Sequence, residues 1–179
     1  MQNLKRILVG VDLSNDECYV ADEVPASTRA AVDRAIWLTQ RNSGQVTFLA
    51  AVMPDYSRFL GAHEDKTEGE LVYEAASDRL EQFCDQAREA GVESHMVCTC
   101  GTPSLELTRA VMESHHDLVI LGSHRHHGLR RLVLGSTGRK MLRVCPSPVW
   151  VTSPQNSGAV KRILAATDFS ETSARAVEV

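Results

Sequence analysis

The residues best suited to chemistry in this sequence lie in one short stretch, Gly122 to Gly138, which reads GSHRHHGLRRLVLGSTG. The stretch holds three histidines and three arginines between glycines, and it follows the apolar run Leu118–Leu121. Residues of these types could form a metal site, a phosphate-binding loop, a nucleic-acid patch or a basic surface loop. The elements around the stretch decide between these uses.

The segment Gly135-Ser136-Thr137-Gly138 has the composition of a phosphate-binding turn. It opens an expected last helix that runs to Val144, so backbone N–H groups and the positive end of the helix dipole meet two hydroxyls there. Its two glycines have no side chain to obstruct a ligand. The alternative is a Ser or Thr N-cap, with glycines that serve turn geometry. The residues alone leave both interpretations open.

Asp12 is a second candidate for ligand binding, because it follows Gly10-Val11 at the end of an expected strand. In a parallel sheet, ligands collect at the carboxyl ends of the strands. The Asp12 carboxylate can accept hydrogen bonds from a base amine or a ribose hydroxyl, and it can equally cap the next turn.

The histidines suggest a metal site, but nothing in their spacing along the sequence requires one. His124, His126 and His127 lie in the stretch, with His115 and His116 just before it. Metal sites draw ligands from several elements and need supporting hydrogen bonds, so we predict no metal here. The five cysteines are odd in number and scattered, and we expect reduced thiols in a cytoplasmic protein.

Motifs of the common hydrolases and nucleotidases are absent from the sequence. It contains no Gly-x-Ser-x-Gly elbow and no Gly-x-x-x-x-Gly-Lys-Ser/Thr loop. No obvious general base or pair of Mg²⁺ carboxylates accompanies the Gly135 turn, so phosphoryl transfer would be slow. We therefore expect a binding protein and no enzyme.

Length and composition fit a globular protein with one full core. The chain has 179 residues, 43% of them hydrophobic and 23% charged. A net charge of -4 argues against a general nucleic-acid coat. No apolar run approaches the roughly 20 residues of a membrane helix, and the N-terminus lacks the pattern of a signal peptide.

Short apolar runs alternate with helix-length amphipathic segments along the chain. Runs without period-2 alternation favour strands that are covered on both faces. The alternation predicts an α/β fold, an open five-stranded parallel sheet with helices on both faces. The expected strands are 7–11, 46–52, 95–98, 118–121 and 149–151; the expected helices are 28–40, 67–90, 104–114 and 138–144; and long loops are expected at 13–26 and 54–66.

The C-terminal residues repeat the start of the chain. After linker-like residues 154–159, VKRILAATDFS reprises LKRILVGVDLS, and the helices that follow match if Asn15–Pro25 is an insertion. A repeated strand–turn–helix opening is typical of tandem domains. We predict one domain over 1–153 and the first strand and helix start of a second, truncated repeat over 160–179. The matching residues are Lys5, Arg6, Ile7, Leu8, Asp12 and Ser14 in the first copy and Lys161, Arg162, Ile163, Leu164, Asp168 and Ser170 in the second.

Over Leu4–Ser153 the chain resembles the universal stress protein family. The resemblance implies an adenine-nucleotide alpha-hydrolase-like fold with a five-stranded parallel sheet, and a stress-response sensor or regulator that binds ATP or AMP. The segments that carry it are the KRILVGVDLS opening, Gly101-Thr102-Pro103, Asp117 to His124, Leu134 to Thr137, and Cys145 to Val149.

The resemblance also implies where an adenine nucleotide would lie. Adenine would contact the ends of the first two strands, ribose the end of the fourth, and phosphates the loop after it and the start of the last helix. The implied residues are Val11, Asp12 and Val52 for adenine, Leu121 and Gly122 for ribose, and His124, Gly135, Ser136 and Thr137 for the phosphates.

Arg125 departs from the family pattern of Gly, two residues, Gly, nine residues, then Gly-Ser or Gly-Thr. The chain keeps Gly122 and Gly135-Ser136 at the right distance, but Arg125 replaces the middle glycine. Its side chain either blocks the backbone's approach to phosphates or supplies a guanidinium to them. The alternative function is thus a nucleotide-independent protein-interaction module.

Val149–Val151 is expected to be an edge strand, which invites pairing. Family members commonly pair there, so the resemblance implies a homodimer through this strand. The expected partners are thus an adenine nucleotide, a second copy and an unknown protein, with no nucleic acid and no membrane.

Overall fold

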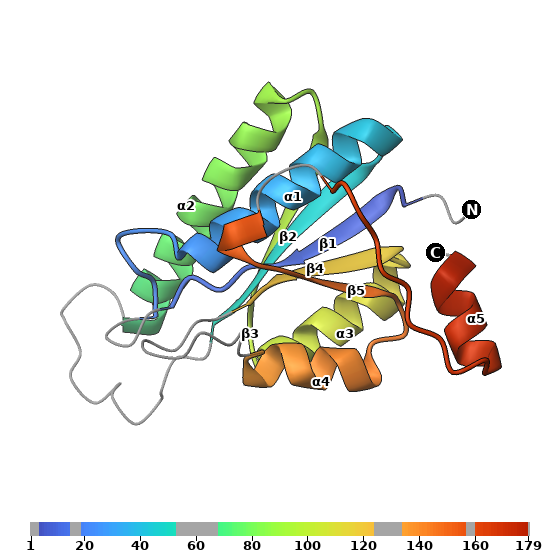
Figure 1. Cartoon of the computed structure of the whole chain (residues 1–179). Helices are drawn as coiled ribbons and strands as arrows, with labels where there is room; N and C mark the ends of the chain where they lie inside the picture. The colour runs from blue at the N-terminus through green and yellow to red at the C-terminus, as the bar shows by residue number, and fades with distance from the viewer. Residues whose placement is uncertain (1–3, 15–18, 53–67, 124–133, 157–159, 179) are drawn as a thin grey trace.

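The computed structural model describes residues 4–14, 19–52, 68–123, 134–156 and 160–178 (Figure 1). Five parallel strands form one open sheet in the order β3-β2-β1-β4-β5, which confirms the predicted fold class. The strands are β1 (Arg6–Gly10), β2 (Gln45–Val52), β3 (Glu93–Cys100), β4 (Leu118–Gly122) and β5 (Val149–Thr152). The helices are α1 (Ala26–Asn42), α2 (Glu68–Glu89), α3 (Pro103–Ser114), α4 (Ser136–Val144), the short 3-10 helix η2 (Pro154–Asn156) and α5 (Glu171–Glu178).

Strand β1 is the centre of the sheet, because it pairs with β2 on one side and β4 on the other. Its residues Ile7, Leu8 and Val9 have no exposed surface. Such a strand must be apolar on both faces, which is why the run has no alternation. The apolar runs that predicted β1, β2 and β4 therefore correctly indicated buried strands.

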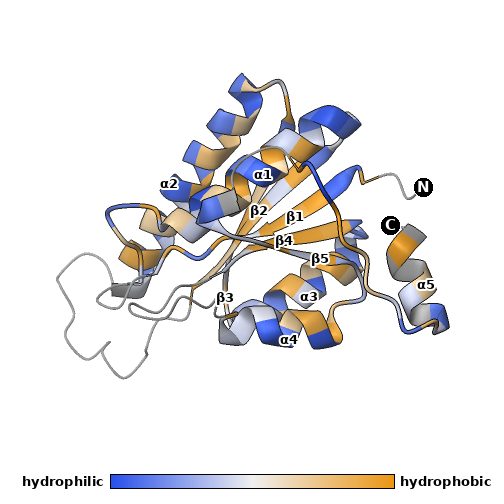
Figure 2. Cartoon of the chain, in the orientation of Figure 1, coloured by the Kyte–Doolittle hydropathy of each residue, from blue (hydrophilic) through white to orange (hydrophobic). Residues whose placement is uncertain are grey.

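Two cores lie on opposite faces of the sheet. Helices α1 and α2 pack on one face, where Ile7, Val9 and Phe48 join the larger core. Helices α3 and α4 lie on the other face, where Leu8, Leu107 and others form the smaller one. Figure 2 shows the apolar strands between these layers. The predicted two-faced cover is confirmed for the central strands.

Strand β3 departs from that expectation, because among the described elements a helix packs on only one of its faces and the edge itself is exposed. Helix α2 packs on it, whereas α3 lies over β1 and β2. Met96 and Val97 are each 40% exposed. The sequence predicted this strand over 95–98, whereas the structure extends it over Glu93–Cys100, and the expected cover on both faces is wrong for it.

The C-terminal segment lies outside both cores. Residues 160–168 form no strand, and Ile163, Leu164 and Phe169 are 87%, 96% and 93% exposed. Helix α5 follows them, to one side of the sheet (Figure 1). None of the helices in the described part of the chain is long and apolar enough to cross a membrane.

Candidate functional site

The sheet has a topological switch point beside β1. The chain leaves β1 toward β2 and β3, and then returns on the other side of β1 as β4. Gly10 pairs with Leu121, so the residues after β1 and after β4 emerge next to each other at the carboxyl edge. A crevice at such a point is where open α/β sheets bind ligands. The structure thus brings Asp12 and Gly122 to one edge.

The carboxylate of Asp12 holds the turn that follows β1. Its Oδ1 accepts hydrogen bonds from the Ser14 backbone N–H at 3.0 Å and from the Ser14 hydroxyl at 2.7 Å. The Thr28 hydroxyl, in the first turn of α1, donates to the Asp12 carbonyl oxygen at 2.6 Å. The turn-forming role left open by the sequence is therefore present, and it fixes the orientation of a half-buried carboxylate at the carboxyl edge.

Three apolar residues assigned to the crevice lie at the ends of adjoining strands. Val11 is 7% exposed, Val52 is 6% exposed and Leu121 is 5% exposed. The Val11 backbone N–H donates to the Leu49 carbonyl at 2.8 Å, which ties the end of β1 to β2. Val11 and Val52 belong to the core on the α1–α2 face of the sheet, whereas Leu121 belongs to the core on the α3–α4 face. The three side chains therefore do not form one continuous apolar surface.

Gly122 has a packing reason of its own. A Cβ at this position would lie 2.5 Å from the carbonyl oxygen of Ser27, in the first turn of α1. Only glycine permits this approach of helix and strand. The requirement exists without a ligand, so Gly122 by itself is weaker support for a ribose site than the family motif implied.

Helix α4 begins at the same edge of the sheet, because a helix between parallel strands runs back against their direction (Figure 1). Its N-cap is Gly135, which has no side chain to cap the first turn. The alternative of a Ser or Thr N-cap is therefore wrong, because Ser136 and Thr137 are already inside the helix. A glycine cap supplies no side-chain acceptor to the first-turn N–H groups, which suits an anion.

Two predicted phosphate contacts, His124 and Arg125, lie outside the described residues, as do His126 and His127. Among the residues that are described, no group of three or more His, Cys, Asp or Glu side chains could hold a metal ion. Cysteines 84, 98, 100 and 145 are free, and burial raises the pKa of Cys84, Cys98 and Cys145.

His116 is a buried structural residue on the α3 side of the sheet. Its ring nitrogens lie 3.1 Å from the Ala110 carbonyl oxygen and 3.3 Å from the Thr47 hydroxyl. Burial, and secondarily the charge of Arg6, lowers the pKa of His116, while Ala110 and Asp117 act in the opposite direction. The neutral ring thus joins the end of α3 to β2.

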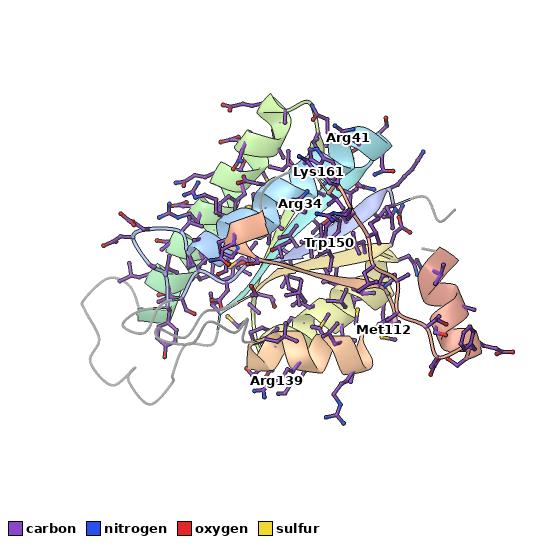
Figure 3. The ribbon with its side chains drawn as sticks, viewed as in Figure 1. Arg34, Arg41, Met112, Arg139, Trp150 and Lys161 are labelled. Atoms are coloured by element: carbon purple, nitrogen blue, oxygen red, sulfur yellow. The ribbon has the colours of Figure 1, made fainter. Side chains whose placement is uncertain are left out.

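A stack of arginines and tryptophans was missed by the sequence reasoning. The Arg34 guanidinium lies 5.2 Å from the ring centroid of Trp37 and 5.5 Å from that of Trp150, and Arg41 lies 4.8 Å from Trp37 (Figure 3). Arg34 is only 7% exposed. Since Trp150 belongs to β5, the stack ties α1 to an edge strand. The signal in the sequence was the helical spacing of Arg34 and Trp37 at i, i+3 and of Trp37 and Arg41 at i, i+4.

The sheet order and the likeness to solved structures define an α/β domain with the adenine-nucleotide alpha-hydrolase-like fold. The model of the universal stress protein family matches residues 3–153, and the chain belongs to this family.

This chain matches different shares of two curated relatives. Universal stress protein E of Photorhabdus laumondii is 27% identical over 162 residues, which cover 87% of this chain and 47% of that protein. Universal stress protein A homolog 2 of Coxiella burnetii is 26% identical over 144 residues, with coverage of 79% and 90%. The chain therefore spans about half the length of the first of these relatives.

Solved structures share the fold at low identity. A universal stress protein from Archaeoglobus fulgidus has a TM-score of 0.71 at 19% identity, covering 97% of this chain and 60% of that one. An Arabidopsis thaliana family protein with AMP bound has a TM-score of 0.58 at 15% identity, with coverage of 88% and 97%. A universal stress protein in complex with cAMP has a TM-score of 0.56 at 19% identity, with coverage of 86% and 99%.

Proposed function

We propose that the chain binds an adenine nucleotide, AMP or ATP, at the carboxyl edge of the sheet and acts as a stress-response regulator in the cytoplasm. The base lies against Val11, Val52 and Asp12, the ribose beside Leu121 and Gly122, and the phosphates at the start of α4. The α4 start consists of Gly135, Ser136 and Thr137, with His124 and Arg125 before it.

The observation that carries this proposal is the convergence of an oriented carboxylate and a helix start at one edge. Asp12 is held by Ser14, and α4 begins with a glycine cap and no side-chain cap. A base needs the first feature and a phosphate needs the second. The two solved proteins described with AMP and cAMP share this fold. We propose binding without catalysis.

Equilibrium dialysis with labelled AMP and ATP tests the proposal. Replacing Asp12 with alanine removes a hydrogen bond to a charged group, worth about 1.5–3 kcal/mol, so the Kd should rise roughly tenfold or more. Asp168→Ala is the matched control, since Asp168 makes the same turn with Ser170 on the exposed C-terminal segment. Absence of binding to the unaltered chain would refute the proposal.

The alternative is a protein-interaction module that binds no nucleotide. Arg125, in place of the middle glycine of the family motif, is the observation that favours it. The substitution Arg125→Gly separates the two functions. If Arg125→Gly creates AMP or ATP binding that the unaltered chain lacks, the alternative is correct for the natural sequence.

The β5 edge is the proposed homodimer contact. Val149, Trp150 and Val151 are half-buried at the end of the sheet, and β5 pairs only with β4 among the described strands. Tryptophan and arginine are enriched at interface centres, and the Arg34–Trp150 contact places both here. Val151→Lys should lower the sedimenting mass by one pairing step, because it places a charge at this edge. A sedimenting mass that Val151→Lys leaves unchanged would exclude the contact.

The C-terminal segment is proposed to be the opening of a second family domain. Ser170 N–H donates to Asp168 at 2.9 Å, as Ser14 N–H donates to Asp12 at 3.0 Å. Both turns lead toward a helix, and the first curated relative is about twice as long as the matched region. Joined to the remainder of a family domain, residues 160–178 should lose their exposure, which amide exchange would detect.

A further inference from the structure

In the part of the chain that the structure describes, strand β3 is a long sheet edge whose own sequence lacks the usual protection. Its register with β2 runs unbroken from Glu93 to Cys100, and it lies at the end of the strand order. The strand contains no proline, no lysine and no bulge, which are the devices that normally prevent edge pairing. The opposite edge, β5, has only 4 residues and follows Pro146 and Pro148.

Apolar side chains are exposed on both faces of this edge. Met96 and Val97, at the middle of β3, are each 40% exposed and point to opposite faces. On the α2 face, Tyr73 is 42% exposed, and its hydroxyl donates to the Cys98 carbonyl oxygen at 3.2 Å. The Cys98 carbonyl oxygen therefore already accepts a hydrogen bond from the Tyr73 hydroxyl. A backbone N–H of an incoming strand would bond to the same carbonyl oxygen. Exposed apolar surface along a sheet edge indicates an interaction surface.

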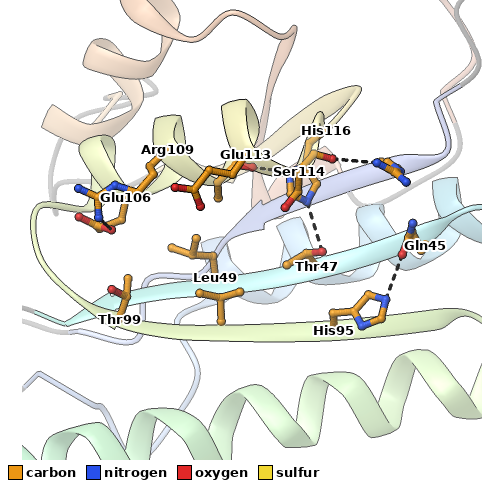
Figure 4. A pocket seen from close by; sticks show the side chains of 13 residues that line it. Gln45, Thr47, Leu49, His95, Thr99, Glu106, Arg109, Glu113, Ser114 and His116 are labelled. Atoms are coloured by element: carbon orange, nitrogen blue, oxygen red, sulfur yellow. Dashed lines mark hydrogen bonds and ion pairs between the residues drawn. The ribbon is translucent and has the colours of Figure 1, made fainter.

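The other face of β3 forms half the floor of a groove of about 580 Å³ (Figure 4). Helix α3 walls the groove on one side, and the floor runs from β2 out to β3. None of the residues in the predicted nucleotide set lines it. The floor residues are Gln45, Thr47 and Leu49 of β2 and His95, Val97 and Thr99 of β3, and the wall includes Glu106, Arg109, Ala110 and Glu113.

Two arginines that line the groove are bonded to groups of helix α3. Arg109 Nη1 lies 2.9 Å from Glu106 Oε2, and the Glu106 side chain is only 9% exposed. At the other end, Arg6 Nη1 donates to the Ser114 carbonyl oxygen at 3.1 Å. Of the two apolar residues in the floor, Leu49 is buried and Val97 is 40% exposed, so Val97 is the surface that a neighbour would cover.

We propose that β3 pairs with β3 of a second copy, which joins the two five-stranded sheets into one. A contact between two identical edges must be self-complementary, and a two-fold axis makes the strands antiparallel. Between Ser94 and Cys100 the side chains include no Asp, Glu, Lys or Arg, so the pairing opposes no like charges. Glu93 falls beside the far end of the opposite strand.

The second copy also completes the groove. A two-fold axis perpendicular to the sheet keeps the α3 layers of both copies on one face. The two groove floors then meet across the paired strands, with Val97 of both copies between the α3 walls, while Met96 and Tyr73 meet on the other face. This contact is independent of the β5 contact, so a chain that uses both edges assembles beyond a dimer.

Sedimentation equilibrium of the whole chain tests the proposal. Val97→Lys and Met96→Lys place a charge at the edge and should lower the weight-average mass at high concentration by one pairing step. Met112→Lys is the control, since Met112 is 64% exposed on α3, away from β3, and its variant should match the unaltered chain. Val151→Lys removes only the β5 contact. Equal masses for Val97→Lys, Met96→Lys and Met112→Lys would overturn the proposal.

Amide hydrogen exchange of the unaltered chain gives a second measurement that needs no variant. The amides of β3 should exchange several-fold more slowly in concentrated than in dilute protein, while those of α3 should not change. Exchange at β3 that is independent of concentration would overturn the proposal. So would a monomer whose β3 is protected only by an added peptide, because the occupant would then be a different strand.

Discussion

Two segments of this chain have nearly the same sequence and different structures. Lys5-Arg6-Ile7-Leu8 enters β1, where Ile7 and Leu8 have no exposed surface. Lys161-Arg162-Ile163-Leu164 forms no strand, and its Ile163 and Leu164 are 87% and 96% exposed. The residue types are identical, so the difference lies in the neighbours. β1 has β2 and β4 beside it and helices on both faces. Strand formation here is a property of the sheet rather than of the segment.

The turns that follow the two segments are alike. Asp12 accepts the Ser14 N–H at 3.0 Å, and Asp168 accepts the Ser170 N–H at 2.9 Å. An Asp two residues before a Ser makes this turn with its own backbone and needs no tertiary partner. The comparison therefore separates the turn, which local sequence encodes, from the strand, which packing encodes.

The largest expected effect comes from truncating equivalent leucines. Leu8→Ala removes a fully buried side chain between the two helical layers and should lower the free energy of unfolding by about 2–5 kcal/mol. Leu164→Ala, at an exposed position, should change it by no more than about 0.5 kcal/mol. Urea unfolding measures both, and equal losses would show that the second segment is packed as the first is.

The stability of the chain should depend on pH through His116, which is buried close to Arg6 of β1. The pKa of His116 is lowered from 6.5 in the folded chain, chiefly by burial and further by Arg6. Below pH 6.5 the unfolded chain therefore binds more protons than the folded one, so this contribution to stability is present above pH 6.5 and lost as pH falls. As pH falls below 6.5, the melting temperature of the unaltered chain should fall, and that of His116→Gln should fall less steeply. Parallel slopes would contradict this assignment.

The smallest effect concerns the second turn alone. Hydrogen bonds from Ser170 and Ser173 hold the pKa of Asp168 at about 2, below its usual 3.8. Ser170→Ala should raise that pKa toward 3.8, as followed by NMR titration of the carboxyl carbon. No change would mean that the turn does not form in solution, and the local half of the comparison would fail.

Local sequence patterns predicted most of the fold. The errors arose at residues whose environment depends on elements that are distant in sequence. Apolar runs located β1, β2 and β4 because central strands are buried on both faces. The open face of β3 depends on where α3 packs, which no local pattern reports. For the same reason, Arg34 between Trp37 and Trp150 could not be foreseen, since the tryptophans are distant in sequence.

The candidate site was predicted in part. Asp12 and the α4 start reach the same edge because parallel topology requires it. The glycine cap at Gly135 and the packing of Gly122 on Ser27 depend on backbone geometry, which residue types leave open. Family resemblance supplied the remaining site residues, and two of them, His124 and Arg125, lie outside the described residues.

Amide NMR during titration with AMP tests the central claim most directly, because it locates the ligand and compares the two copies in one experiment. We predict saturable shifts at Asp12, Gly122 and Gly135–Gly138, with none at Asp168 and Ser170. Saturable binding that leaves the α4 start and Asp12 unperturbed, or no binding at all, would contradict the account.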